Sequence, residues 1–322
     1  FTLESGDEKT VPFKFDDCPV PCAEAMGIDL KSEDVTHYAF NTTINQNSIW
    51  DNKVYISKDV ILTVDGVTLD ITTADVIFDD CAGIDFINGG NIIASNSVFR
   101  PCDDSRVWRG LKFDATTEPS TLGILNECTF KNASKAVDIQ ASGGGQNANL
   151  RFTNNLFTNC QNGISLTNVT LNRAISGNTF QTDNDHPDFS VQCVNTNALY
   201  VFIVANRCDL AAEITQNDFV DATTNSSYIG MRLIEIQAAS ISQNKFINNR
   251  VSINGFFNSN IKIEDNEFSV TDNVWNGPGQ IYFGESNNTM IKNNEFYNLD
   301  LNNESSGNGV DKKSAIHVLN QS

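Results

Sequence analysis

Short segments of alternating hydrophobic and polar residues recur along most of the chain, separated by asparagine-rich turns. The stretch ISQNKFINN at 241–249 is typical, because it places an Asn two positions before a Phe and further Asn residues after it. Similar stretches occur at 150–166, 261–273 and 290–303. Their apolar runs of three to five residues are too short and too β-branched for helices, and therefore predict β-strands.

The Phe of this pattern recurs at intervals of 21 to 39 residues. A unit near 22 residues with variable additions is typical of a solenoid whose coils carry loops. The pattern places this residue at Phe78, Phe99, Phe130, Phe157, Phe180, Phe219, Phe246, Phe268 and Phe296.

An Asn precedes the Phe by two positions in most of these units. Asn tolerates left-handed backbone geometry, and its amide can bond to the equivalent amide of the next coil. We therefore expect an asparagine ladder at one corner. Its members are Asn155, Asn178, Asn217, Asn244, Asn266 and Asn294, with Ser97 and Cys128 in two earlier units.

Three short strands per coil, each stacked on its counterpart in the next coil, predict an all-β parallel solenoid with Phe and Ile columns inside. Over residues 53–319 the repeats resemble those of right-handed parallel β-helix proteins, the pectate-lyase-like superfamily. The handedness follows from this resemblance and from the rule for parallel crossovers. The expected organisation is an N-terminal cap over residues 1–52, and a β-helix of about nine to eleven coils over 53–322. The C-terminal end shows no comparable cap, which favours a piece of a longer chain or an end covered by another module or subunit.

The net charge of −19 repels nucleic acid, and no run approaches the length of a membrane span. It also disfavours polyanionic sugars unless a metal ion or a local basic patch intervenes. The eight cysteines indicate either local disulfides and an oxidising compartment, or free buried thiols. The local pairs would be Cys18 with Cys22 and Cys193 with Cys208.

Two further cysteines follow the reference Phe by three residues. This spacing predicts that Cys81 and Cys102 stack on adjacent coils, either bridged or packed as small hydrophobic residues. With three His and no paired C-x-x-C motifs, a zinc site is disfavoured.

After five of the reference Phe residues the next strand is delayed, so that five insertions leave the same corner and should form a wall of loops along one flank. The five are Phe99, Phe180, Phe219, Phe268 and Phe296. Flat rings beside charged groups are typical of a sugar-binding surface. The alternative is that each Trp packs its own loop against the helix. The candidate carbohydrate-binding residues are Trp108, Arg106, Arg109, His186, Tyr228 and Trp275.

The second insertion is also acidic. Asp183, Asp185 and Asp188 are compatible with a Ca²⁺ ion, but without the Gly and Glu of a full EF-hand loop a solvated acidic turn is the favoured explanation. No cofactor is required by the pattern.

Enzymes with this fold carry recognisable catalytic motifs. The polygalacturonase motifs are absent. The segment AGIDFINGG at 82–90 is similar to one segment of pectin methylesterases, which would imply Asp85 as nucleophile, but the partner segments are missing. A lyase base would be sought among Arg100, Arg106, Arg109 and Lys112, for which ion pairing is the simpler role.

The segments at 53–71 and 91–113 also resemble secreted Bacteroidetes surface β-helix proteins, for which adhesion or glycan binding is inferred. The sequence therefore predicts an extracellular or cell-surface module that binds a polysaccharide, a cell-surface glycan or another surface partner along the loop wall. The alternatives are a polysaccharide lyase or glycoside hydrolase with its site on the same flank, and a structural spacer of a larger surface protein.

Overall fold

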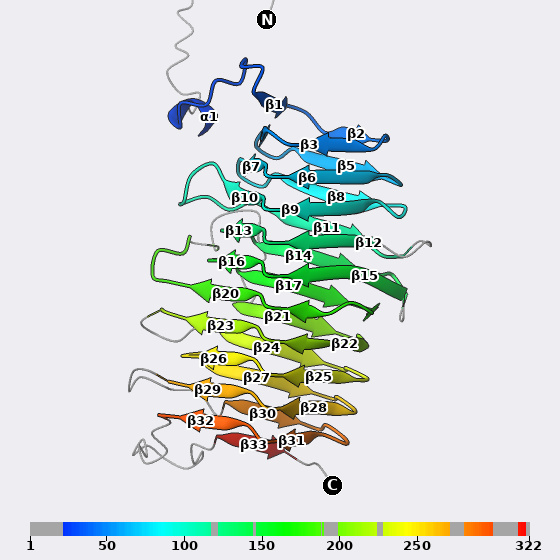
Figure 1. Cartoon of the computed structure of the whole chain (residues 1–322), viewed down its shortest axis with the longest axis vertical. Helices are drawn as coiled ribbons and strands as arrows, with labels where there is room; N and C mark the ends of the chain where they lie inside the picture. The colour runs from blue at the N-terminus through cyan, green and yellow to red at the C-terminus, as the bar shows by residue number, and fades with distance from the viewer. Residues whose placement is uncertain are drawn as a thin grey trace, which may run out of the picture.

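The computed structural model describes residues 22–116, 122–143, 146–187, 189, 199–223, 228–270, 280–298 and 315–319. Within these residues the chain forms three long parallel sheets of 11 strands each. In every sheet the successive strands are stacked along the long axis of the molecule (Figure 1). The chain visits sheets A, B and C in turn and then begins the next coil. The prediction of a parallel β-helix is confirmed.

Sheet A carries the Phe of the repeat. Its strands are β1 (Val35–Tyr38), β4 (Lys53–Ile56), β7 (Asp75–Phe78), β10 (Val98–Pro101), β13 (Thr129–Lys131), β16 (Leu156–Thr158), β20 (Thr179–Thr182), β23 (Asp218–Asp221), β26 (Lys245–Ile247), β29 (Glu267–Ser269) and β32 (Glu295–Tyr297).

Sheet B follows sheet A in each coil. Its strands are β2 (Thr42–Ile44), β5 (Ile61–Asp65), β8 (Gly83–Ile87), β11 (Gly110–Asp114), β14 (Lys135–Gln140), β17 (Asn162–Thr167), β21 (Val201–Asn206), β24 (Ile229–Ile234), β27 (Val251–Phe256), β30 (Ile281–Gly284) and β33 (Ile316–Leu319).

Sheet C completes the coil. Ten of its strands follow one another, and the eleventh, β18 (Val169–Leu171), pairs beside β15. The ten are β3 (Ser48–Trp50), β6 (Thr68–Thr72), β9 (Asn91–Ser95), β12 (Leu122–Asn126), β15 (Gln146–Thr153), β19 (Ile175–Ser176), β22 (Leu210–Thr215), β25 (Ala239–Ser242), β28 (Ile261–Glu264) and β31 (Met290–Lys292).

The interior of sheet A is a column of stacked Phe rings from Phe99 to Phe296, with neighbouring ring centroids 4.7–5.0 Å apart. The prediction that Phe78 begins this column is wrong. Strand β10 pairs with β7 so that Phe99 lies opposite Val76, and Phe78 is two residues further along. Consequently Cys81 and Cys102 do not occupy equivalent places in their coils.

The corner between sheets C and A holds the repeated Asn. The Nδ2 of each Asn donates to the Oδ1 of the next, at 2.9–3.0 Å, from Asn155 through to Asn294. The same Oδ1 also accepts the backbone N–H of the preceding member. The left-handed geometry that we expected of these residues belongs instead to the residue just before, such as Asn154 or Gln243.

The described part of the N-terminal region, residues 22–52, holds a short helix and strands. The first coil, β1 to β3, already lies within residues 35–50. The short helix α1 (Cys22–Ala25) packs its Cys22 and Ala23 against Tyr55 and Ile77, which sheet A turns outward. The helix therefore covers part of the side of sheet A. No helix in the described ranges is long and apolar enough to cross a membrane.

Candidate functional site

The connections from sheet A to sheet B vary more in length than any others. The insertions predicted after five Phe residues all leave the solenoid at this A–B corner, where they follow β10, β20, β23, β29 and β32. Each of these connections leads into the next strand of sheet B. The candidate site therefore consists of this corner and the outer face of sheet B.

Two of the predicted sugar-binding rings are buried. Trp108 is 0% exposed, stacks on Phe78 with centroids 4.1 Å apart, and donates its Nε1–H to the Lys131 carbonyl at 2.7 Å. Tyr228 is also 0% exposed and stacks on Phe202 at 5.0 Å. Neither ring has a face open to a sugar. Both hold a loop against the solenoid, which for Trp108 is the alternative that the sequence left open.

Arg106 is committed to an internal ion pair. Its Nη1 lies 2.7 Å from Asp79 Oδ1 and 2.9 Å from Asp80 Oδ2. Burial raises the pKa of Asp80, and the nearby Arg106 charge opposes this. Tyr55 donates its hydroxyl to Asp79 Oδ2 at 2.9 Å. Arg106 thus fixes the first loop, and is less available to a ligand than the sequence suggested.

Arg109 is more accessible. Its Nη2 lies 3.6 Å from Asp85 Oδ2, and its side chain is 40% exposed. It points to the outer face of sheet B, and is one of the predicted residues that remains available there.

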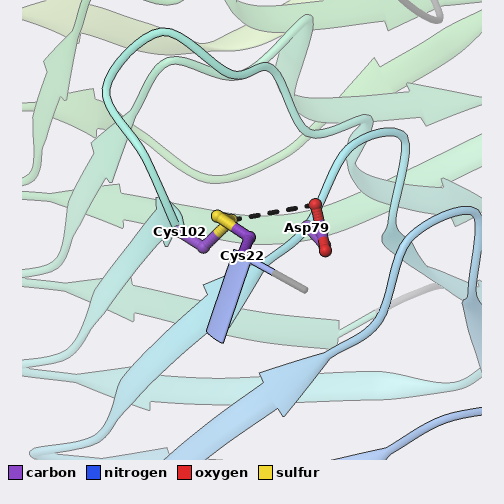
Figure 2. A group of neighbouring side chains, drawn as sticks. All are labelled: Cys22, Asp79 and Cys102. Carbon is purple, nitrogen blue, oxygen red and sulfur yellow. Dashed lines mark hydrogen bonds between the residues drawn. A yellow bond between two sulfur atoms is a disulfide. The ribbon is translucent and has the colours of Figure 1, made fainter. Parts of the chain in front are cut away.

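Figure 2 shows Cys22, Asp79 and Cys102, whose ligand atoms all lie within 4.8 Å of one another. The two sulfur atoms form a disulfide, so they are not thiolate ligands for a metal. The bond instead ties α1 to the end of β10, 80 residues along the chain. The prediction of local pairing is wrong for Cys22.

The remaining described cysteines divide into two groups. Cys81 is disulfide-bonded as well. Cys128, Cys160 and Cys208 are free and buried, so Cys208 does not form the predicted bridge to Cys193. Burial raises the pKa of Cys128 to about 11 and of Cys160 to about 12, which keeps these thiols protonated and unreactive.

The acidic insertion after β20 is partly described. Asp183 Oδ1 accepts the backbone N–H of Asp185 and the Nδ2 of Asn159, both at 2.9 Å, so this carboxylate closes its own turn. His186 is half-buried, with its ring 5.8 Å from that of Tyr200. Asp188 and Trp275 lie outside the described residues, and the calcium prediction stays a prediction.

A column of outward-facing side chains on sheet B was not recognised from the sequence. Strand pairing places one residue of each successive strand in register, about 4.8 Å from the next. The column consists of Thr63, Asp85, Lys112, Asp138, Ser165, Val204, Arg232, Asn254, Tyr282 and His317. We call it the sheet B column.

Several polar atoms in the sheet B column are buried without a hydrogen-bond partner in the described part of the chain: Asp85 Oδ1, Asp138 Oδ1, Arg232 Nε and Asn254 Oδ1. Asp138 is only 7% exposed, and its other oxygen accepts from Lys135 Nζ at 3.0 Å. Burial raises the pKa of Asp85, against the opposing charges of Arg109 and Lys112. A buried polar atom without a hydrogen bond lowers the stability of the fold unless a ligand or a water molecule supplies the missing bond.

The signal for this column was present in the sequence. In segments such as GIDFI and KAVDIQ, a polar residue stands between two inward apolar residues, at the same place in each sheet B strand. It is visible only once the strands are in register, because the intervening turns differ in length.

No family model matches this chain, and no curated protein shows significant sequence similarity to it. Among solved structures it is similar to that of PfbA, a surface adhesin of Streptococcus pneumoniae, at 9% identity and a TM-score of 0.39, covering 86% of each chain. A second structure, of the Streptococcus pneumoniae surface protein and adhesin PfbA, matches at 9% identity and a TM-score of 0.38 over 92% of this chain and 94% of that one. At this level of similarity neither structure identifies residues or ligands of the present chain.

Proposed function

We propose that this protein is an extracellular or cell-surface β-helix module that binds a polysaccharide along the sheet B column, beside the loops of the A–B corner. The carrying observation is the column of polar side chains in register on the outer face of sheet B, in which Asp85, Asp138, Arg232 and Asn254 each keep a polar atom without a hydrogen-bond partner in the described residues. Sugar hydroxyls both donate and accept hydrogen bonds, and pair with carboxylate, amide and guanidinium groups alike.

The geometry of the column suits a chain-like ligand. Its members repeat at the spacing of the coils along the axis of the solenoid. Charged residues occur between Asp85 and Arg232, and Tyr282 stacks on His317 near the C-terminal end with centroids 5.3 Å apart. An extended polysaccharide would bind such a surface in two ways: its hydroxyls would form hydrogen bonds with the charged residues, and a pyranose ring would pack against the aromatic residues.

The A–B corner supplies the flank of this surface. In the proposal, Arg109, His186 and Trp275 contact the glycan, while Arg106, Trp108 and Tyr228 hold the loops in place. Asp183, Asp185 and Asp188 remain candidates for a calcium ion in the same flank. The Cys22–Cys102 disulfide supports an oxidising, extracellular location.

The test is retention of the protein on a panel of immobilised neutral and acidic polysaccharides, followed by affinity measurements on the variant Lys112→Ala. If Lys112 donates a charged hydrogen bond to the ligand, its loss should weaken binding at least about tenfold. The matched control is Lys262→Ala, an outward lysine on sheet C whose Nζ is paired with Glu264. Equal weakening by both variants, or no retention at all, would contradict the proposal, and the latter would favour a structural spacer.

An enzyme acting on polysaccharide is the second candidate. Asp85 and Asp138 belong to the same column on either side of Lys112, so their backbones lie about 10 Å apart. Two carboxylates flanking a bound sugar are the requirement for glycoside hydrolysis. Mass spectrometry of the soluble fraction after incubation with each polysaccharide separates the two functions, because released oligosaccharides would show catalysis.

A further inference from the structure

A groove on the outer face of sheet C lies away from the sheet B column. It has a volume of about 430 Å³, within the range of pockets that hold small ligands. Its lining comes from β6, β9, β12 and β15 and from the residues after β18. The lining residues include Asn91, Ile93, Ile124, Asn149, Arg151 and Arg173.

The floor of this groove is aliphatic and open to solvent. Ile93 and Ile124 are 43% and 44% exposed, and strand pairing places them side by side on successive coils. Arg151 follows Ile124 in the same outward column, one coil further along. The apolar floor therefore ends at a cationic side chain.

The two arginines of the groove are exposed, and within the described ranges no carboxylate lies within ion-pair distance of either. Arg151 Nε donates to Thr153 Oγ1 at 3.0 Å, which orients the guanidinium. Arg173 follows β18, whose pairing with β15 and whose buried Leu171 fix this segment. Two such arginines are notable in a chain with a net charge of −19.

We propose that this groove binds a carboxylated sugar residue of an acidic glycan, with Arg151 and Arg173 holding the carboxylate. Guanidinium groups match carboxylates with paired hydrogen bonds. The aliphatic floor packs against the C–H face of the ring, and Asn91 and Asn149 also line the groove. The net negative charge of the chain disfavours binding of an acidic glycan unless a local basic patch is present. This groove supplies such a patch.

An acidic peptide fits this groove less well. Peptides that bind sheets usually do so by adding a strand to an exposed edge. Strand β12 is paired with β9 on one side and β15 on the other, so its backbone offers no free edge. Recognition here depends on side chains alone, which favours a compact ligand with a carboxylate and hydroxyls.

The experiment is isothermal titration calorimetry with a short oligogalacturonate and with its methyl ester, which has the same sugars without the charge. We expect the acid to bind at least about tenfold more tightly than the ester, and the double variant R151Q/R173Q to lose at least about tenfold in affinity. Binding of the acid should weaken as salt increases. Sialyllactose, compared with lactose, tests a carboxylate on a different sugar.

The matched control is Arg207→Gln, which removes an exposed arginine at the corner between sheets B and C, where it is paired with Glu235. It should leave the affinity within about twofold of the wild type, as expected for a surface ion pair. All three arginines are exposed, so circular dichroism should show the same fold. Equal affinity for acid and ester, equal loss with Arg207→Gln, or equally tight binding of an oligoglutamate would overturn the proposal.

This inference does not depend on the sheet B column. Lys112→Ala should leave binding of the acidic oligosaccharide unchanged, while R151Q/R173Q should leave retention on a neutral polysaccharide unchanged. If the acid is lost with Lys112→Ala and not with the arginine variant, the acidic sugar binds on sheet B and the groove is not its site.

Discussion

The C–A and A–B corners of the same solenoid are built in opposite ways. At the C–A corner a left-handed residue precedes an Asn in coil after coil, and the Asn side chains from Asn155 to Asn294 bond to one another. At the A–B corner each insertion has its own length and its own packing, such as Trp108 on Phe78. The regular corner therefore shows what the coils have in common, whereas the irregular corner shows how each coil differs from the others.

The comparison predicts that the buried aromatic residues of the irregular corner, Trp108 and Tyr228, are structural. Trp108→Ala should lower the free energy of unfolding by about 4 kcal/mol, because it leaves a cavity beside Phe78 and frees the Lys131 carbonyl. Urea denaturation followed by circular dichroism measures this change. Ile49→Ala, at a site 72% exposed, is the control and should cost less than about 0.5 kcal/mol. Unchanged stability with lost glycan binding would instead make Trp108 a ligand contact.

A disulfide stabilises the same corner at its N-terminal end. The double variant Cys22→Ser/Cys102→Ser opens a covalent loop of 80 residues and should cost about 3 to 4 kcal/mol. The loss should appear as a lower denaturation midpoint of the first coils. Cys208→Ala removes a free thiol and should have a clearly smaller effect. If the two variants are equally stable, the bond does not constrain the unfolded chain.

Substitutions at the regular corner should lower the free energy of unfolding by a smaller amount, which should be similar from one coil to the next. Asn217→Ala removes the acceptor of both the backbone N–H and the Nδ2 of Asn178, and should cost about 2 to 3 kcal/mol. Asn244→Ala should cost a similar amount, because its bonds repeat the pattern. The exposed Asn172→Ala is the control, since it loses one surface bond to Asn147 and its backbone is not left-handed. Widely different costs for Asn217 and Asn244 would show that the column is not a true repeat.

The smallest effect concerns pH. The raised pKa of Asp85 means that the folded protein holds this proton to a higher pH than the unfolded chain does. The resulting stability is greatest below the ordinary carboxyl range and is lost as pH rises through the folded pKa. Asp85→Asn should therefore gain stability relative to the wild type as pH rises above about 4. Ser165→Ala, in the same column, should keep the wild-type pH profile.

The fold was predictable from the regular corner. The spacing of Asn and Phe predicted three-stranded coils without any knowledge of the loops. The prediction is first wrong at Phe78, because Val76 and not Phe78 lies opposite Phe99 in the neighbouring coil. The amide bonding of the Asn residues follows from their repetition. Their left-handed geometry does not, because the preceding residue takes it whether it is Asn, Gln or Glu.

The candidate site was less predictable because burial in a loop depends on how the loop folds back. The sequence shows only that Trp108 and Tyr228 belong to insertions, which predicts exposed rings. Both rings are fully buried in the structure. Residue 22 and residue 102 are joined across coils, which no local spacing indicates. The sheet B column and the sheet C groove appear only when strands separated by variable loops are aligned.

The direction of the hydrogen bonds has a mechanical consequence. They run along the axis of the solenoid, so a force along that axis pulls each coil directly away from its neighbour, and an end coil, which is bonded on one side only, separates first. The protein should then yield coil by coil at low force, rather than as one rigid body. The Cys22–Cys102 bond closes the first coils into a covalent loop, so residues 22–102 would add almost no length to the extended chain while it is intact. In a tethered molecule this end would remain short under tension while the coils beyond it lengthen.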